Sequence, residues 1–138
     1  MAQAPQKKPR HIPRPPQASK PFWDATKQGK LVLQYDPEAK RYQFWPRAIS
    51  VASGKQNLEW REASGKGKLY SYTVTHVPVA GFEDKVPYVI GLVELDEGVR
   101  IMANMPNVKA DQVKIGMPVK VGFEKLSDDI TYFYFDPA

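Results

Sequence analysis

The sequence predicts a mainly β protein, in which a five-stranded barrel follows a short N-terminal helix and a small, hairpin-rich ribbon. Strand-like segments separated by turn residues fill the chain from residue 58 onward. One short helical pattern, at 109–114, interrupts them. With 42% hydrophobic and 12% aromatic residues, a chain of 138 residues can bury the core of one domain. We expect an arm at 1–20, the helix and ribbon at 21–62, and the barrel at 63–138.

The arm at residues 1–20 carries the excess charge of the chain. It holds basic residues and no acidic one, and it accounts for the whole formal net charge of +5. The remaining 118 residues hold 15 basic and 15 acidic side chains. Frequent prolines and few large apolar side chains predict a disordered, basic, Pro-rich arm, and a partner-binding arm is the alternative. Because the folded body is neutral, its charge argues against a nucleic-acid groove.

Residues 21–28 form the first predicted element, a short helix. A proline suits its first turn, and Gly29 ends it. A strand, LVLQY, is expected at 31–35. The adjacent Phe22 and Trp23 either pack onto the main domain or dock another subunit, because so short a helix cannot bury both against its own neighbours.

Two small turns, DPEA at 36–39 and SVAS at 50–53, give the next segment the layout of a zinc ribbon. Each turn holds two positions three residues apart, but neither turn contains the cysteine or histidine that structural zinc usually needs. We expect Asp36 and Ser50 to cap these turns by accepting backbone N–H bonds. Packing of apolar and aromatic side chains is expected to hold the ribbon together, namely Leu33, Tyr35, Tyr42, Phe44, Trp45, Ile49 and Leu58.

Five strand-like segments follow the ribbon. The first lies within GKGKLYSYTVTHV at 65–77. The segments at 87–96 and 99–105 are joined by Asp-Glu-Gly, a turn sequence that predicts a hairpin. PVKVGFEKL at 118–126 and ITYFYFDPA at 130–138 supply the last two strands. Five strands with one helical turn between the third and fourth is the order of a small Greek-key barrel, the OB-fold, and an all-β sandwich is the alternative.

The sequence resembles the DUF35 family, the acyl-CoA-associated OB-fold proteins with an N-terminal rubredoxin-like zinc ribbon. The matching stretches span about residues 21–135: PFWDATKQGKLVLQY, WPR, LEWREASGKGKLYSYTVTHVP, PYVIGLVELDEGVRIMANM and KIGMPVKVGFE. The resemblance implies four zinc-ligand positions, which are cysteines in typical members and fall here on Asp36, Ala39, Ser50 and Ser53. Alanine offers no donor and a serine hydroxyl is a poor zinc ligand, so we predict that zinc does not bind.

The resemblance also implies a function. Similar proteins accompany thiolase-like enzymes as tightly associated, non-catalytic subunits that help to form or cap the acyl-CoA site. The partner would supply the catalytic cysteine, because this chain has none. Candidate contacts for the phosphates or adenine of coenzyme A are Arg47, Lys66 and Lys68, with solvated surface charges as the alternative. Candidate partner-docking residues are aromatic: Phe22, Trp23, Trp45, Tyr132, Phe133, Tyr134 and Phe135.

The residues themselves favour binding over catalysis. His11 and His76 stand alone, and SGKG at 64–67 lacks the length and following helix of a P-loop. The alternatives are a single-stranded nucleic-acid-binding OB-fold protein and, further away, a stand-alone hydrolase or hydratase. No covalently bound cofactor is expected, and coenzyme A thioester is considered only for a site shared with the partner. The apolar runs are too short to cross a bilayer and no secretory signal is recognised, so a cytoplasmic location is the default expectation. Self-association through exposed aromatics is considered when the partner is missing.

Overall fold

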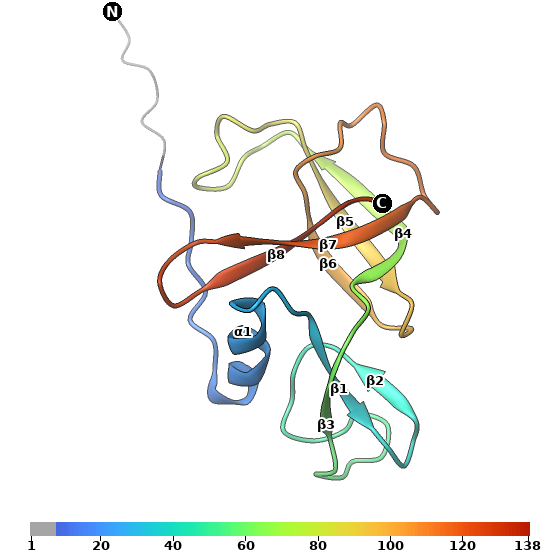
Figure 1. Cartoon of the computed structure of the whole chain (residues 1–138). Helices are drawn as coiled ribbons and strands as arrows, with labels where there is room; N and C mark the ends of the chain where they lie inside the picture. The colour runs from blue at the N-terminus through green and yellow to red at the C-terminus, as the bar shows by residue number, and fades with distance from the viewer. Residues whose placement is uncertain (1–7) are drawn as a thin grey trace, which may run out of the picture.

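The computed structural model describes residues 8–138, which form a small three-stranded sheet, a larger five-stranded sheet and one short helix between them (Figure 1). The elements in chain order are η1 Gln17–Ser19, α1 Lys20–Thr26, β1 Val32–Asp36, β2 Arg41–Gln43, β3 Glu59–Glu62, β4 Lys66–Thr75, β5 Tyr88–Leu95, β6 Arg100–Met105, β7 Pro118–Lys125 and β8 Thr131–Pro137. The ribbon sheet has the order β2-β1-β3, and the barrel sheet has the order β6-β5-β4-β7-β8. The predicted mainly β fold is confirmed.

Helix α1 lies close to its predicted position. Proline occupies its first turn, and Gly29 follows with a φ of +70°, a left-handed conformation that glycine adopts without steric cost. The side chain of Thr26 donates a 2.8 Å hydrogen bond to the carbonyl of Trp23 and closes the last turn. The predicted strand at 31–35 is also present, shifted by one residue as β1.

The five-stranded sheet curls into a partly open barrel of the OB-fold type. Its end strands, β6 and β8, lie against each other although no ladder joins them. Strand β4 has a register shift between Leu69 and Ser71, where one extra residue lets it bend and pair with both β5 and β7. The predicted hairpin is confirmed, with Gly98 at a φ of +90° in the turn between β5 and β6. The predicted helical insertion is a single turn, closed by a 3.1 Å bond from Val113 N to Lys109 O.

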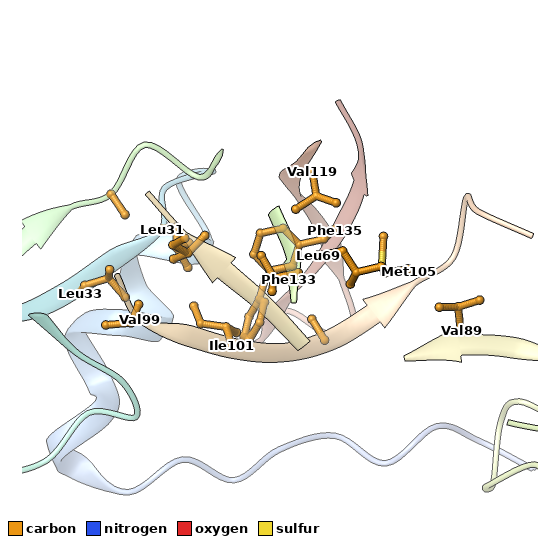
Figure 2. Packing of buried hydrophobic residues seen from close by; sticks show 14 of the residues in the cluster. Leu31, Leu33, Leu69, Val89, Val99, Ile101, Met105, Val119, Phe133 and Phe135 are labelled. Atoms are coloured by element: carbon orange, nitrogen blue, oxygen red, sulfur yellow. The ribbon is translucent and has the colours of Figure 1, made fainter. Parts of the chain in front are cut away.

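One hydrophobic core runs through both sheets (Figure 2). Figure 2 shows Leu31 and Leu33 at the ribbon end of this core and Val89 and Met105 at the opposite end. Phe133, with none of its surface exposed, lies between them. The predicted boundary between ribbon and barrel falls on the connection from β3 to β4, and the core is continuous across it.

Over its described part the arm contacts the folded body, and its disorder stays a prediction. The guanidinium of Arg10 forms a 2.9 Å ion pair with Glu124 on β7 and lies 4.9 Å from the ring centre of Phe82. Ser19 is buried at the start of α1, and its hydroxyl donates to the carbonyl of Pro16 at 2.9 Å. Residues 1–7 lie outside the described part of the chain. No helix among the described residues is long and apolar enough to cross a membrane.

Candidate functional site

The connection from β2 to β3, residues 44–58, presents the exposed apolar side chains of the ribbon. We call it the ribbon loop. Trp45 and Ile49 are each 45% exposed, and Val51 is 63% exposed. The ring of Trp45 leans on Phe44 at a centroid distance of 4.1 Å and also contacts the rings of Phe22 and Phe133, at 6.0 and 6.1 Å, so the indole is supported from the core and only partly exposed. An exposed indole on the same loop as two exposed aliphatic side chains is the kind of surface that protein partners cover.

Two buried glutamines hold the first half of the ribbon loop. Gln34 on β1 accepts a 2.8 Å bond from Arg47 N and donates a 2.7 Å bond to Arg47 O. Gln43 on β2 donates to the side-chain oxygen of Gln34 at 2.9 Å, and accepts from Val51 N at 2.9 Å. Gln43 also donates to Ile49 O at 3.3 Å. Because both amides are almost fully buried, these bonds fix the backbone that carries the exposed apolar residues.

The four predicted zinc-ligand positions do meet, but around a carboxylate. Asp36, only 1% exposed, accepts a 2.6 Å bond from the hydroxyl of Ser50 and a 2.7 Å bond from the hydroxyl of Ser53. The backbone N–H of Ala39 donates to the other carboxylate oxygen at 3.0 Å. The carboxylate therefore occupies the place between the two turns and links them directly.

Further donors complete this network. Asn57 at the far end of the ribbon loop donates to Asp36 at 2.9 Å, and Glu38 N does so at the same distance. The pKa of Asp36 is held well below its ordinary range, first by the Ser50 hydroxyl and then by the Ala39 N–H and the other donors, against the opposing effect of burial. The expected turn capping is confirmed, since Ser50 Oγ also accepts Ala52 N at 3.1 Å.

These side chains do not suit zinc. Ala39 has no side-chain donor atom, and the two serine hydroxyls already donate their protons to Asp36. Within residues 8–138, no three or more histidine, cysteine or acidic side chains are grouped as metal ligands would be. The absence of zinc stays a prediction. The expectation that apolar packing holds the ribbon needs a correction: Leu33 is buried, but Trp45 and Ile49 are half exposed, and the polar network joins the turns.

Four of the predicted docking aromatics are core residues. Phe22, Phe133 and Phe135 are fully buried and Trp23 is 6% exposed, so these side chains cannot reach a partner. The prediction that they dock is wrong because α1 lies between the sheets and packs on β8. Tyr132 and Tyr134 alternate with the buried phenylalanines of β8 and are partly covered, and Tyr132 also packs against the core. Tyr132 contacts the ring of Trp23 at 5.7 Å, and the ring of Tyr134 lies over Gly122, whose missing Cβ leaves it room.

The three candidate coenzyme A contacts lie on different elements. Arg47 is an exposed residue of the ribbon loop, next to Trp45. Lys66 and Lys68 are exposed on one face of β4, with buried Gly67 between them. A Cβ at Gly67 would lie 2.3 Å from Glu94 O, so close packing of β4 on β5 explains this glycine. The role of the three cations in binding coenzyme A stays a prediction.

The glutamine pair was missed from the sequence. Gln34 and Gln43 stand in strands β1 and β2, where a glutamine usually faces solvent. An available signal was the two-residue period of β1, which places Gln34 on the same side as Asp36 in the first ribbon turn. His11 and His76 are both exposed, His11 in the arm and His76 just after β4.

Comparison with known proteins finds similarity over most of this chain. Residues 60–124 match the family model of the C-terminal OB-fold domain of ChsH2. A probable enoyl-CoA hydratase alpha subunit of Thermomonospora curvata is 37% identical over 119 residues, which is 85% of this chain and 37% of that protein. A DUF35 domain-containing scaffold protein of Methanocaldococcus jannaschii is 42% identical over 85 residues, which is 58% of this chain and 60% of that protein. The chain thus spans between about a third and three fifths of the length of these relatives.

Solved structures extend this similarity to the three-dimensional fold. A chain of the structure described as "Ltp2-ChsH2(DUF35) aldolase" has a TM-score of 0.81 and 32% sequence identity, covering 91% of this chain and 98% of that one. A DUF35 protein of unknown function from Sulfolobus solfataricus has a TM-score of 0.62 at 16% identity, a likeness of fold alone.

Proposed function

Because the chain belongs to the DUF35 family of OB-fold proteins, we propose that it is a non-catalytic accessory subunit of a thiolase-like acyl-CoA enzyme and helps to form or cap the acyl-CoA site of that enzyme. The observation that carries the proposal is the match to a chain of the Ltp2-ChsH2(DUF35) aldolase along 98% of that chain's length. The hydratase subunit and scaffold names of other relatives support a role in an enzyme assembly.

The ribbon loop supplies the docking surface in this proposal. Trp45, Ile49 and Val51 offer apolar surface to the partner, and the buried glutamines keep the loop in one conformation before binding. A loop that is already ordered loses little conformational entropy on association, which favours affinity. Tryptophan at the centre of such a patch is a typical hot-spot residue.

In this proposal the chain helps to position acyl-CoA and does not react with it. Arg47 follows Trp45 by two residues, so a cation lies at the rim of the proposed interface, where a phosphate of coenzyme A would meet it. The chain has no cysteine, so the nucleophile of a thiolase-type reaction has to come from the partner.

Co-purification tests the proposal. The tagged chain is expressed in its native host, and the co-purifying protein is identified by mass spectrometry and then reconstituted with the chain at defined stoichiometry. We expect a thiolase-like enzyme that forms a stable complex and turns over acyl-CoA faster with the chain than without it. Val51→Ser is expected to weaken the complex, whereas Val77→Ser, at an 81% exposed valine outside the ribbon loop, leaves it intact.

Two outcomes would reject this function. One is that no ketoacyl-CoA enzyme co-purifies, or that the reconstituted enzyme is indifferent to the chain. The other is salt-sensitive binding of single-stranded oligonucleotides by a variant lacking residues 1–20, which would favour the nucleic-acid alternative.

A further inference from the structure

A cavity of about 370 Å³ lies at the end of the barrel farthest from the ribbon. It is bounded by the start of β5, the end of β6, strand β8 and the connection between β4 and β5. Figure 2 shows two of its wall residues, Val89 and Met105, at that end of the core. The cavity lies where β6 and β8 face each other without a hydrogen-bonded ladder, so side chains rather than backbone close this seam. Its volume falls within the range of small-molecule sites.

The inner wall of this barrel-end cavity is apolar. Val89, Met105 and Val108 are buried core residues that also face the cavity. The rings of Phe82 and Tyr88 stand 5.1 Å apart at its side and add flat aromatic surface. A wall of this composition accepts a hydrocarbon chain or ring and has little to offer a sugar or a hydrated ion.

Polar groups gather toward the mouth of the cavity. Two basic side chains and one acidic side chain line it: Arg10, Lys85 and Glu124. Arg10 and Glu124 neutralise each other in their 2.9 Å ion pair. Lys85, 5.3 Å above the centre of the Phe82 ring, makes no ion pair with any residue in the described part of the chain. One positive charge is therefore left at the mouth of an apolar cavity.

Neutral polar groups also face this space without partners among residues 8–138. Asn104, Tyr88 and Tyr134 line the cavity, and the side chains of these three residues make no hydrogen bond within that range. Burial raises the pKa of Tyr132, another lining residue, so its hydroxyl stays protonated and can donate. Each of these neutral groups can donate a hydrogen bond, which suits a ligand that brings acceptor oxygens.

We propose that the barrel-end cavity binds a small apolar carboxylate, with its hydrocarbon body against Val89, Met105 and Val108 and its carboxylate at Lys85. Asn104 supplies a neutral donor to the same oxygens. The arm forms one side of the site, because Arg10 packs directly on Gly81 in the loop between β4 and β5. The packing is so close that a Cβ added to Gly81 would lie 2.4 Å from Arg10 Cγ. The site belongs to the chain alone and does not depend on the accessory role proposed above.

A pair of matched probes tests this assignment on the isolated, full-length chain. The ¹⁵N-labelled protein is titrated with 4-phenylbutyrate and with 4-phenyl-1-butanol, which share the apolar body and differ in charge. We expect saturable shifts at the amides of Val89, Met105 and Val108, with a dissociation constant about tenfold lower for the acid, as one charge-assisted hydrogen bond gives. Lys85→Gln is expected to remove this advantage and leave the alcohol unchanged. Lys109→Gln, at an exposed lysine outside the cavity, is the control.

The proposal has clear failure points. Equal affinity for acid and alcohol in the wild-type protein would reject the carboxylate assignment. Shifts that map to the ribbon loop, or an absence of saturable shifts, would reject the site. Val108→Phe fills the cavity and is expected to abolish both titrations. Should that variant fold poorly, the Lys85→Gln comparison decides alone, because it alters an exposed side chain and leaves the core unchanged.

Discussion

Replacing Gln34 by leucine removes the amide that holds the ribbon loop and puts an apolar side chain of similar size in its place. Gln34 is 4% exposed and makes three hydrogen bonds, at 2.7, 2.8 and 2.9 Å. The two bonds to Arg47 reach an exposed segment, so water can replace part of them. Loss of the third bond leaves the side-chain NH2 group of Gln43, a residue that is 8% exposed, with one long bond of 3.3 Å to Ile49 O, while its side-chain oxygen still accepts from Val51 N. We expect a loss of about 2–3 kcal/mol in the free energy of unfolding.

Urea denaturation followed by far-UV circular dichroism and tryptophan fluorescence measures this loss. Because the ribbon and barrel share one core, both signals are expected to move together. Gln56→Leu is the matched control, since Gln56 is an exposed residue of the same loop with no side-chain hydrogen bond among the described residues. A change of less than about 0.5 kcal/mol for Gln34→Leu, no larger than an ordinary surface substitution, would show that the glutamine pair does not hold the loop.

Three further predictions concern the ribbon and its aromatic neighbours. Asp36→Asn is expected to make the free energy of unfolding less dependent on pH in acid. The pKa of Asp36 is depressed in the folded state, so the carboxylate contributes fully to stability above its ordinary pKa of 3.8, and this contribution is lost as the pH falls below that value. Urea midpoints measured from neutral pH down to about pH 3 test this. Elemental analysis is expected to find far less than one zinc per chain, with no change of Tm on adding EDTA; stoichiometric zinc would contradict the proposed carboxylate network. Phe22→Ala, at a fully buried ring, is expected to cost about 3–5 kcal/mol, and Trp45→Ala, at a half-exposed one, about 2 kcal/mol, so equal costs in calorimetry would contradict the division between core and docking residues.

The local elements were predictable because local chemistry decides them. Gly29 ends α1 through a backbone conformation that other residues avoid, and the Asp-Glu-Gly turn at 96–98 fixes the hairpin of β5 and β6. The two-residue period of a strand likewise explains why Phe133 and Phe135 of β8 are buried, whereas Tyr132 and Tyr134 are only partly covered. The order of these elements then indicated the OB-fold, and the resemblance to the DUF35 family pointed to the same fold.

The candidate site depended on contacts between distant residues, which no local pattern contains. The paired roles of Gln34 and Arg47 join positions that are 13 residues apart, and Asn57 reaches Asp36 across 21 residues. The burial of Phe22 followed from the position of α1 between the sheets, which a helix of this length does not reveal. Arg10 likewise finds Glu124 only once β7 is folded beside the arm.

The carboxylate network also determines how the ribbon responds to oxidants and to metal chelators. A turn pair joined by thiolates and a metal ion comes apart when peroxide oxidises sulfur or when a scavenger extracts the ion. Asp36, Ser50 and Ser53 contain nothing for either reagent to attack. Acidification is left as the simplest way to separate the two turns, because their contact depends on the charge of one carboxylate.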